Sequence, residues 1–146
     1  MDQIVENLIF GFSTLLGWKP ILIIIGGVVI GIMVGAMPGL SPSTGVALLV
    51  PFSYTMSPAL AVILLVSIYI SSNYGGSITA VLINTPGTPA AAATAIDGYP
   101  MTLKGEAGKG LGISLIASTV GGIFGVFILI VFAVPLAELA ISFHPA

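Results

Sequence analysis

The chain has 146 residues, of which 57% are hydrophobic and only 5% are charged. Three Lys+Arg and five Asp+Glu cannot cover a globular surface of this size, so we expect an integral membrane protein. A formal net charge of -2 without a basic cluster excludes nucleic-acid binding, which needs Lys and Arg to neutralise phosphates. The lack of cysteine excludes disulfides and thiolate metal sites, and we interpret the single histidine, His144, as an interfacial or tail residue.

The N-terminal residues 1–19 predict a short helix lying in the membrane interface. Apolar residues recur at helical spacing from Ile4 to Leu16, with acidic and amide side chains among them. Trp18 and Lys19 are typical of the lipid headgroup level, so the first transmembrane helix is expected directly after them, from Ile21 to Met37. This segment is about 25 Å long as a helix, barely enough to cross the hydrocarbon core.

Two rows of small residues, spaced four apart, predict close helix packing. Such rows let another backbone approach, because they carry little or no side chain. The rows are Gly27, Gly31 and Gly35 in the first span, and Ala117, Gly121 and Gly125 near the C-terminus.

Three hydroxyl-proline pairs, Ser41-Pro42, Ser57-Pro58 and Thr88-Pro89, predict helix starts. Serine or threonine can cap the first turn, and proline suits the first helical position because an N–H there would have no helical partner. The helix from Pro42 to Val50, ended by Pro51, is about 15 Å long, half a bilayer, so we expect it to be re-entrant. The helix after Ser57 is expected to run to about Ser72, close to a full crossing.

The remaining sequence completes the predicted organisation of a single transmembrane segment. Residues 21–85 form a region of broken helices, in which Ser77 to Asn84 is a second short apolar piece. Residues 86–110 are predicted as a polar loop, and residues 111–143 carry the last span. The predicted fold is an all-α integral membrane protein with about three full transmembrane helices, short broken or re-entrant helices, and an N-terminal interfacial helix.

Lysine positions predict the orientation. The positive-inside rule places Lys19, Lys104 and Lys109 on the cytoplasmic side. This requires an even number of crossings between Lys19 and the loop lysines. Two full spans with a re-entrant piece between them satisfy the requirement.

Two segments interrupt the apolar helices with proline, glycine and hydroxyl residues. They are GAMPGLSPSTG, residues 35–45, and SSNYGGSITAVLINTPGTP, residues 71–89. Both contain Pro-Gly followed by a hydroxyl residue and a second proline, which suggests two similar helix-opening turns. Backbone that leaves a helix at membrane depth must be shielded by protein or face water. We therefore expect the second segment to supply half of a site, with SPSTG or a partner segment supplying the rest.

The expected ligand of this site is a carboxylate. Helix N-termini present free N–H groups and the positive end of the helix dipole, so they bind anions without a lysine. Transporters with discontinuous helices hold substrate carboxylates in this way. The alternative for each single residue is a role in helix packing or capping. The candidate substrate-binding residues are Pro38, Gly39, Ser41, Ser43, Thr44, Asn73, Tyr74, Gly75, Gly76, Ser77, Thr79, Asn84, Pro86 and Gly87.

Catalysis is not expected. The sequence offers no Ser/His/Asp set or carboxylate pair for covalent or acid–base chemistry. GEAGKG, residues 105–110, lacks the spacing and the hydroxyl residue of a nucleotide-binding loop. We predict no catalytic residue, no metal centre and no cofactor.

The segments GIMVGAMPGLSPSTGVALLVPFSY, residues 31–54, and IYISSNYGGSITAVLINTPGTPAAAATAIDGYP, residues 68–100, carry a family resemblance. Their PGL, YGGSI, NTPG and DGYP motifs, in this order, resemble the N-terminal part of the large membrane subunit of tripartite tricarboxylate transporters, the TctA family. The resemblance covers the chain from about Gly31 to Phe143.

The resemblance implies a multi-pass protein of the bacterial inner membrane that imports tricarboxylates or related organic acids by cation coupling, with Na⁺ or H⁺. It also implies two partners, a small membrane subunit and an extracytoplasmic solute-binding protein. Members of the family are several times longer, so the chain is expected to need the remainder of the large subunit and not to transport alone.

The sequence also admits two other functions. The main alternative is an assembly or interaction module that docks through the two small-residue rows and transports nothing itself. A channel is less expected, because the sequence shows no ring-forming acidic residue and no carbonyl filter repeat.

Overall fold

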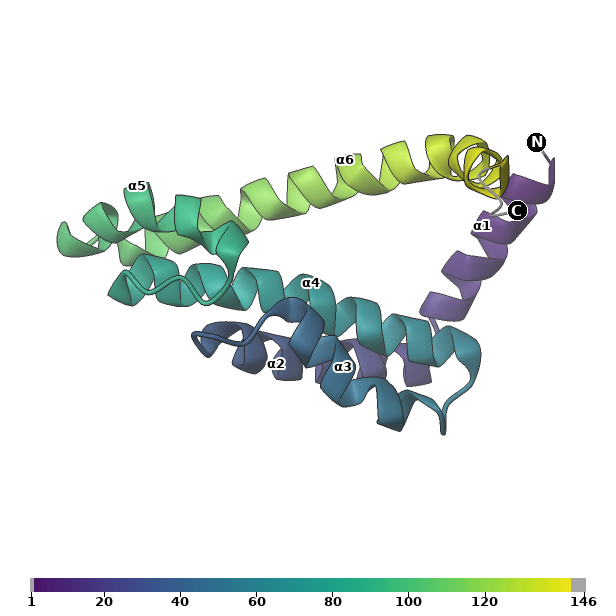
Figure 1. The fold of residues 1–146 in the computed structure, drawn as a ribbon, viewed down its shortest axis with the longest axis horizontal. Helices are drawn as coiled ribbons and strands as arrows, with labels where there is room; N and C mark the ends of the chain where they lie inside the picture. Colours follow the sequence, from purple (N-terminus) through teal and green to yellow (C-terminus); the bar gives the residue numbers. More distant parts are fainter. Residues whose placement is uncertain (1, 143–146) are drawn as a thin grey trace. The chain divides into compact units, whose positions relative to one another are not determined.

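The computed structural model describes residues 2–142, and all regular structure within them is helical (Figure 1). His144 lies outside the described residues. The elements are α1 (Asp2–Leu15), α2 (Trp18–Ala36), α3 (Pro42–Ser53), α4 (Pro58–Ile83), the short 3-10 helix η1 (Pro89–Ala91), α5 (Ala92–Leu103) and α6 (Ala107–Ser142).

Three helices are long and apolar enough to cross a membrane: α2, α4 and the part of α6 from Ala107 to Ala133. The chain is therefore a multi-pass membrane protein, as the sequence predicts. The chain divides into two compact units, Met1–Leu111 and Gly112–Ala146. The first holds α1 to α5 and the start of α6, and the second is the rest of α6, whose described side chains from Leu115 onward are exposed.

Glycines bring α2 and α4 into direct backbone contact, the most extensive contact between any two helices. Gly27 faces Leu64 and Ser67, Gly31 faces Ile68 and Ser71, and Gly35 faces Ser72. The residue numbers of the contacting pairs increase in the same direction along both helices, so α2 and α4 run parallel (Figure 1). The chain returns between them through α3, whose Gly45 packs on Val34 and Ile68.

This parallel arrangement overturns the predicted orientation. Lys19 lies at the beginning of α2. Lys104 follows Thr102, whose hydroxyl donates a 2.7 Å hydrogen bond to the Val81 carbonyl near the end of α4. Lys19 and Lys104 therefore lie at opposite ends of the α2–α4 pair. Because α2 and α4 cross the membrane side by side, the prediction that Lys19 and Lys104 both lie on the cytoplasmic side is wrong.

The predicted break in α4 is also wrong, because the helix continues without interruption through residues 71–83. The backbone of other segments packs directly against its glycines: an added Cβ on Gly75 would lie 2.5 Å from the Ile32 carbonyl oxygen of α2. Its polar side chains bond to the helix itself, Asn73 Nδ2 to the Tyr69 carbonyl at 2.8 Å and Thr79 Oγ1 to the Gly76 carbonyl at 3.2 Å. Tertiary packing thus compensates for the poor helix propensity of glycine.

Other bounds also differ from the predictions. The first span begins at Trp18 instead of Ile21, and α3 extends three residues further than expected, to Ser53, with Pro51 in its last turn. The predicted polar loop, residues 86–110, contains η1 and α5, and it ends inside α6, which begins before residue 111. Helices η1 and α5 pack on α4 through the buried Ala91 and Ala95, which cluster with Ala80 of α4.

Gly31→Ala is expected to destabilise the protein, whereas Gly26→Ala on the same helix is not. An added Cβ at Gly31 would lie 2.6 Å from the Ile68 carbonyl oxygen and 3.0 Å from the Ile68 Cα, which are backbone atoms with no freedom to rotate away. Overpacking of this kind costs about 1–3 kcal/mol. At Gly26 nothing lies within 4 Å of the added atom, and alanine favours a helix more than glycine does.

Thermal unfolding of the purified protein in detergent measures both variants. Equal unfolding temperatures for Gly31→Ala and Gly26→Ala would contradict the backbone contact between α2 and α4.

Candidate functional site

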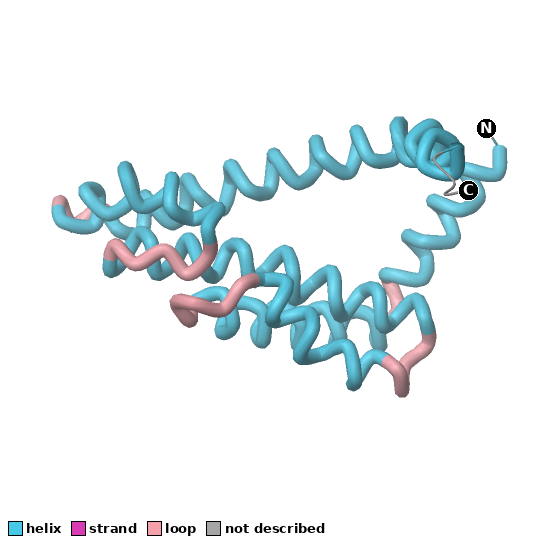
Figure 2. Tube along the Cα trace, in the orientation of Figure 1, coloured by secondary structure: helices cyan, strands magenta, loops and turns pink. Residues whose placement is uncertain are grey.

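The two Pro-Gly turns, far apart in the sequence, line one cavity of about 320 Å³. Both turns are loop segments between helices, drawn in pink in Figure 2. The first joins α2 to α3, and the second joins α4 to η1. The lining residues are Gly39, Leu40 and Ser41 from the first turn, Pro86, Gly87, Thr88 and Pro89 from the second turn and the start of η1, and Ala92 of α5. None of them carries a charged side chain.

Two helices begin at this cavity. Ser41 is the N-cap of α3: its Oγ accepts a 3.1 Å hydrogen bond from the Thr44 backbone N–H and lies 2.8 Å from Thr44 Oγ1. Thr88 is the N-cap of η1, which continues directly into α5. Each N-cap is followed by proline, as the sequence predicts. The remaining N–H groups of the two first turns are donors without helical partners, which suits an anion.

The second turn is held against both long helices by backbone contacts. The Gly87 N–H donates a 3.3 Å hydrogen bond to the Gly76 carbonyl of α4. An added Cβ on Gly87 would meet the Gly35 carbonyl oxygen of α2 and lie 2.9 Å from the Gly76 Cα. Thr88 packs on Gly76 in turn, with its N 2.8 Å from an added Cβ there. We call this meeting of Gly35, Gly76 and Gly87 the glycine junction.

Two buried hydroxyls beside the glycine junction make no hydrogen bond among the described residues, Ser72 Oγ and Thr88 Oγ1. Ser72 is 0% exposed and Thr88 is 3% exposed. Buried polar atoms almost always have partners, so two neighbouring exceptions require an explanation.

The structure gathers only part of the predicted site. Of the fourteen candidates, Gly39, Ser41, Pro86 and Gly87 line the cavity, and Gly76 supports it from α4. Leu40, Thr88, Pro89 and Ala92 also line it without having been predicted as binding residues. Thr88 carried a recognisable signal, since the sequence already marks it as a helix cap.

The other candidates lie elsewhere or in structural roles. Ser43 and Thr44 are exposed in the first turn of α3, and Pro38 is exposed in the turn before it. Asn84 is exposed and ends α4 in the left-handed conformation, at φ 54°. Gly75, Asn73 and Thr79 make the contacts of α4 described above, while Tyr74 is half-buried and Ser77 is buried in that helix.

The second small-residue row behaves differently from the first. In the row Ala117, Gly121 and Gly125 of α6, the two glycines have nothing within 4 Å of an added Cβ. In the first row, by contrast, all three glycines pack against α4.

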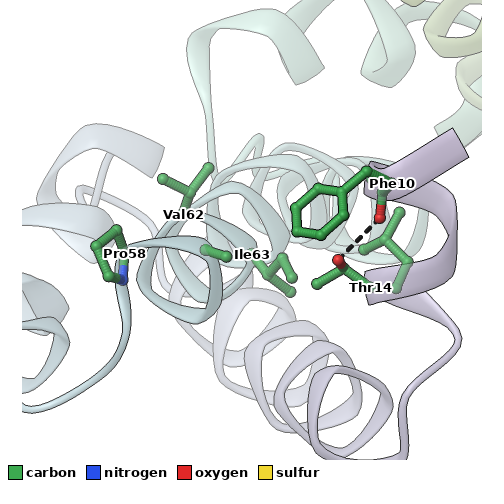
Figure 3. Close-up of a pocket in the computed structure, with 8 residues that line it drawn as sticks. Phe10, Thr14, Pro58, Val62 and Ile63 are labelled. Atoms are coloured by element: carbon green, nitrogen blue, oxygen red, sulfur yellow. Dashed lines mark hydrogen bonds between the residues drawn. The ribbon is translucent and has the colours of Figure 1, made fainter. Parts of the chain in front are cut away.

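A second hollow lies between α1 and the start of α4, with a volume of about 450 Å³. Phe10, Thr14, Pro58, Val62 and Ile63 line it together with other apolar residues (Figure 3). The Thr14 hydroxyl has no proton left for an anion, because it donates a 2.8 Å hydrogen bond to the Phe10 carbonyl of its own helix. This hollow offers nothing to a charged substrate.

The long apolar helices define a multi-pass membrane protein. Sequence comparison makes the assignment specific. The profile described as "Tripartite tricarboxylate transporter TctA family" matches residues 21–146. The chain belongs to this family, which forms the membrane component of tripartite tricarboxylate transporters.

One relative, from Agrobacterium vitis, is described as an uncharacterized 52.8 kDa protein in the TAR-I ttuC' 3' region. It is 41% identical over 143 residues, which are 98% of this chain and 28% of the relative. The chain thus spans well under half of that protein's length. No solved structure gives a significant match.

Gly87→Ala is expected to loosen the second turn. The added Cβ would run into the Gly35 carbonyl oxygen and the Gly76 Cα, so the turn must move away from both helices. A cost of about 1–3 kcal/mol is expected for such overpacking. Each 1.4 kcal/mol raises the fraction of molecules with the turn exposed about tenfold. The chain has no cysteine, so labelling of a Thr88→Cys residue with a maleimide reports this exposure directly.

Gly108→Ala is the matched control, because nothing lies within 4 Å of an added Cβ there. Unchanged labelling of Thr88→Cys in the Gly87→Ala background would show that the turn is not held as described.

Proposed function

We propose that this chain forms the substrate-binding part of a cation-coupled secondary importer of tricarboxylates or related organic acids. The cavity between the two Pro-Gly turns binds one carboxylate of the substrate. The observation that carries this proposal is the convergence of two helix starts, at Ser41 and Thr88, on one cavity without charged side chains. Family membership supports the class of substrate.

A cavity without charged side chains can attract an anion through the helix ends around it. Each helix N-terminus carries the equivalent of about half a positive charge, from N–H groups that have no helical partner. Two such ends around one cavity act together on one carboxylate, and in low-dielectric surroundings their attraction is stronger than in water. A fixed lysine would hold the anion more tightly, and release on the other side of the membrane would be slower.

The proposed setting follows the family. The protein lies in the bacterial inner membrane, works with a small membrane subunit, and receives its substrate from an extracytoplasmic solute-binding protein. The remaining part of the large subunit completes the translocation path. The binding and release steps require no covalent chemistry.

Ser41→Asp tests the proposed cavity, because it keeps the helix cap and changes only the charge. Aspartate is as good an N-cap as serine, but its carboxylate would repel a substrate carboxylate in the cavity. At about 4 Å and an effective dielectric constant of about 20, this repulsion is about 4 kcal/mol. We therefore expect at least a tenfold rise in KM, or loss of uptake, for labelled citrate and other carboxylates in proteoliposomes that hold the complete transporter.

Two controls separate charge from folding. Ser57→Asp places the same charge at the N-cap of α4, which also precedes a proline but does not line the cavity. It should leave KM unchanged. Ser41→Asn keeps the cap without the charge and should retain most of the uptake. Equal uptake by Ser41→Asp and Ser57→Asp would refute the placement of the carboxylate.

A further inference from the structure

We propose that three oxygens at the glycine junction bind a Na⁺ ion: the carbonyl of Gly35, Oγ of Ser72 and Oγ1 of Thr88. This inference rests on the proposed function and deepens it, because it assigns the coupling cation and its position. The ion lies directly beside the carboxylate cavity, since Thr88 belongs to both.

Two unpaired hydroxyls, those of Ser72 and Thr88, support a cation site. Both are buried and make no hydrogen bond among the described residues, and leaving a buried polar group unpaired costs about 1–3 kcal/mol. Thr88 packs on Gly76, and Gly76 is one helical turn from Ser72 on the same face of α4, so the two hydroxyls belong to adjoining positions. A cation bound between them would satisfy both.

The Gly35 carbonyl oxygen is the third proposed ligand. It lies in the last turn of α2, where a carbonyl would accept a hydrogen bond from the N–H three or four residues later. Pro38, three residues later, has no N–H, and Gly39, four residues later, lies beyond the end of the helix. No backbone hydrogen bond to this oxygen is found in the described part of the chain. The oxygen contacts the Gly87 position. It therefore faces the junction, at the end of α2 where the helix dipole is negative and favours a cation.

The chemistry of the three oxygens selects the ion. Carbonyl and hydroxyl oxygens are uncharged hard ligands, which helix ends in transporters present to Na⁺. No carboxylate accompanies them, and the described residues contain no group of three or more acidic, histidine or cysteine side chains that could hold a metal ion. A divalent cation would lack compensating charge. A proton would lack a titratable group, because neither hydroxyls nor carbonyls ionise in the physiological range.

The position explains how the cation would be coupled to the substrate. Helices α3 and η1 direct their positive ends into the carboxylate cavity, while α2 directs its negative end into the junction. Gly87 and Thr88 belong to both. A bound Na⁺ therefore attracts the carboxylate and is attracted by it, and each raises the affinity of the other by the same factor.

The test measures Na⁺ binding to the complete large subunit in detergent, without carboxylate. NaCl should raise the unfolding temperature more than KCl at equal ionic strength, because ligand binding stabilises the folded state. Radioactive ²²Na⁺ should bind in the same concentration range. Ser72→Ala and Thr88→Val should each weaken this binding by about tenfold, equivalent to 1.4 kcal/mol. In K⁺ alone both variants should unfold no earlier than the unsubstituted protein, since neither hydroxyl makes a hydrogen bond there.

Ser67→Ala is the matched control, because its hydroxyl is already bonded to the Ile63 carbonyl of the same helix at 2.7 Å. It should bind Na⁺ normally, and Thr88→Ser, which keeps the hydroxyl, should stay within about threefold. The proposal is overturned if NaCl and KCl stabilise the protein equally, or if Ser72→Ala and Thr88→Val bind ²²Na⁺ as tightly as Ser67→Ala.

The two proposals fail separately. Carboxylate uptake that responds to Ser41→Asp but needs no Na⁺ would leave the carboxylate cavity standing and remove the Na⁺ site. Specific Na⁺ binding, together with carboxylate uptake that Ser41→Asp does not change, would leave the Na⁺ site standing and remove the carboxylate cavity.

Discussion

The structure depends on backbone atoms of different segments touching without side chains between them. At Gly31, Gly35, Gly75, Gly76 and Gly87 an added Cβ would lie within 3 Å of another segment. In lipid, apolar side chains gain little from leaving the solvent, so close van der Waals contact is the force available to hold helices together. The glycines make that contact possible, and they place the second Pro-Gly turn against both α2 and α4.

One result of this packing is a polar region built without charged residues. The end of α2 and the starts of α3 and η1 come together around the same two turns. Their dipoles give neighbouring positions opposite electrostatic character. Fixed charges at membrane depth are expensive, whereas helix ends already belong to the backbone. An apolar sequence can therefore form a region suited to ions.

The sequence predicts features that depend on local chemistry. Ser41, Ser57 and Thr88 stand at the N-caps of helices as expected, because the proline after each of them suits the first helical position. Of the three, Ser41 makes the predicted side-chain hydrogen bond to the first turn. Prediction from sequence fails where distant contacts decide. Asn73 to Ser77 looks like a break when read alone, yet α2 and Thr88 pack against its glycines and keep α4 continuous. The two Pro-Gly turns share a visible likeness, but their meeting around one cavity depends on α2 and α4 running parallel, which no local pattern specifies.

The length of α2 bears on the depth of the cavity in the membrane. Nineteen residues make a helix of about 28 Å, close to the thickness of the hydrocarbon core. With Trp18 at the headgroups of one leaflet, Ala36 reaches the opposite leaflet, and α4 continues about 16 Å past the level of Gly35. The cavity then lies toward the leaflet opposite Trp18 and not at the bilayer centre. A charged molecule arriving from that side would meet it before crossing the middle of the bilayer.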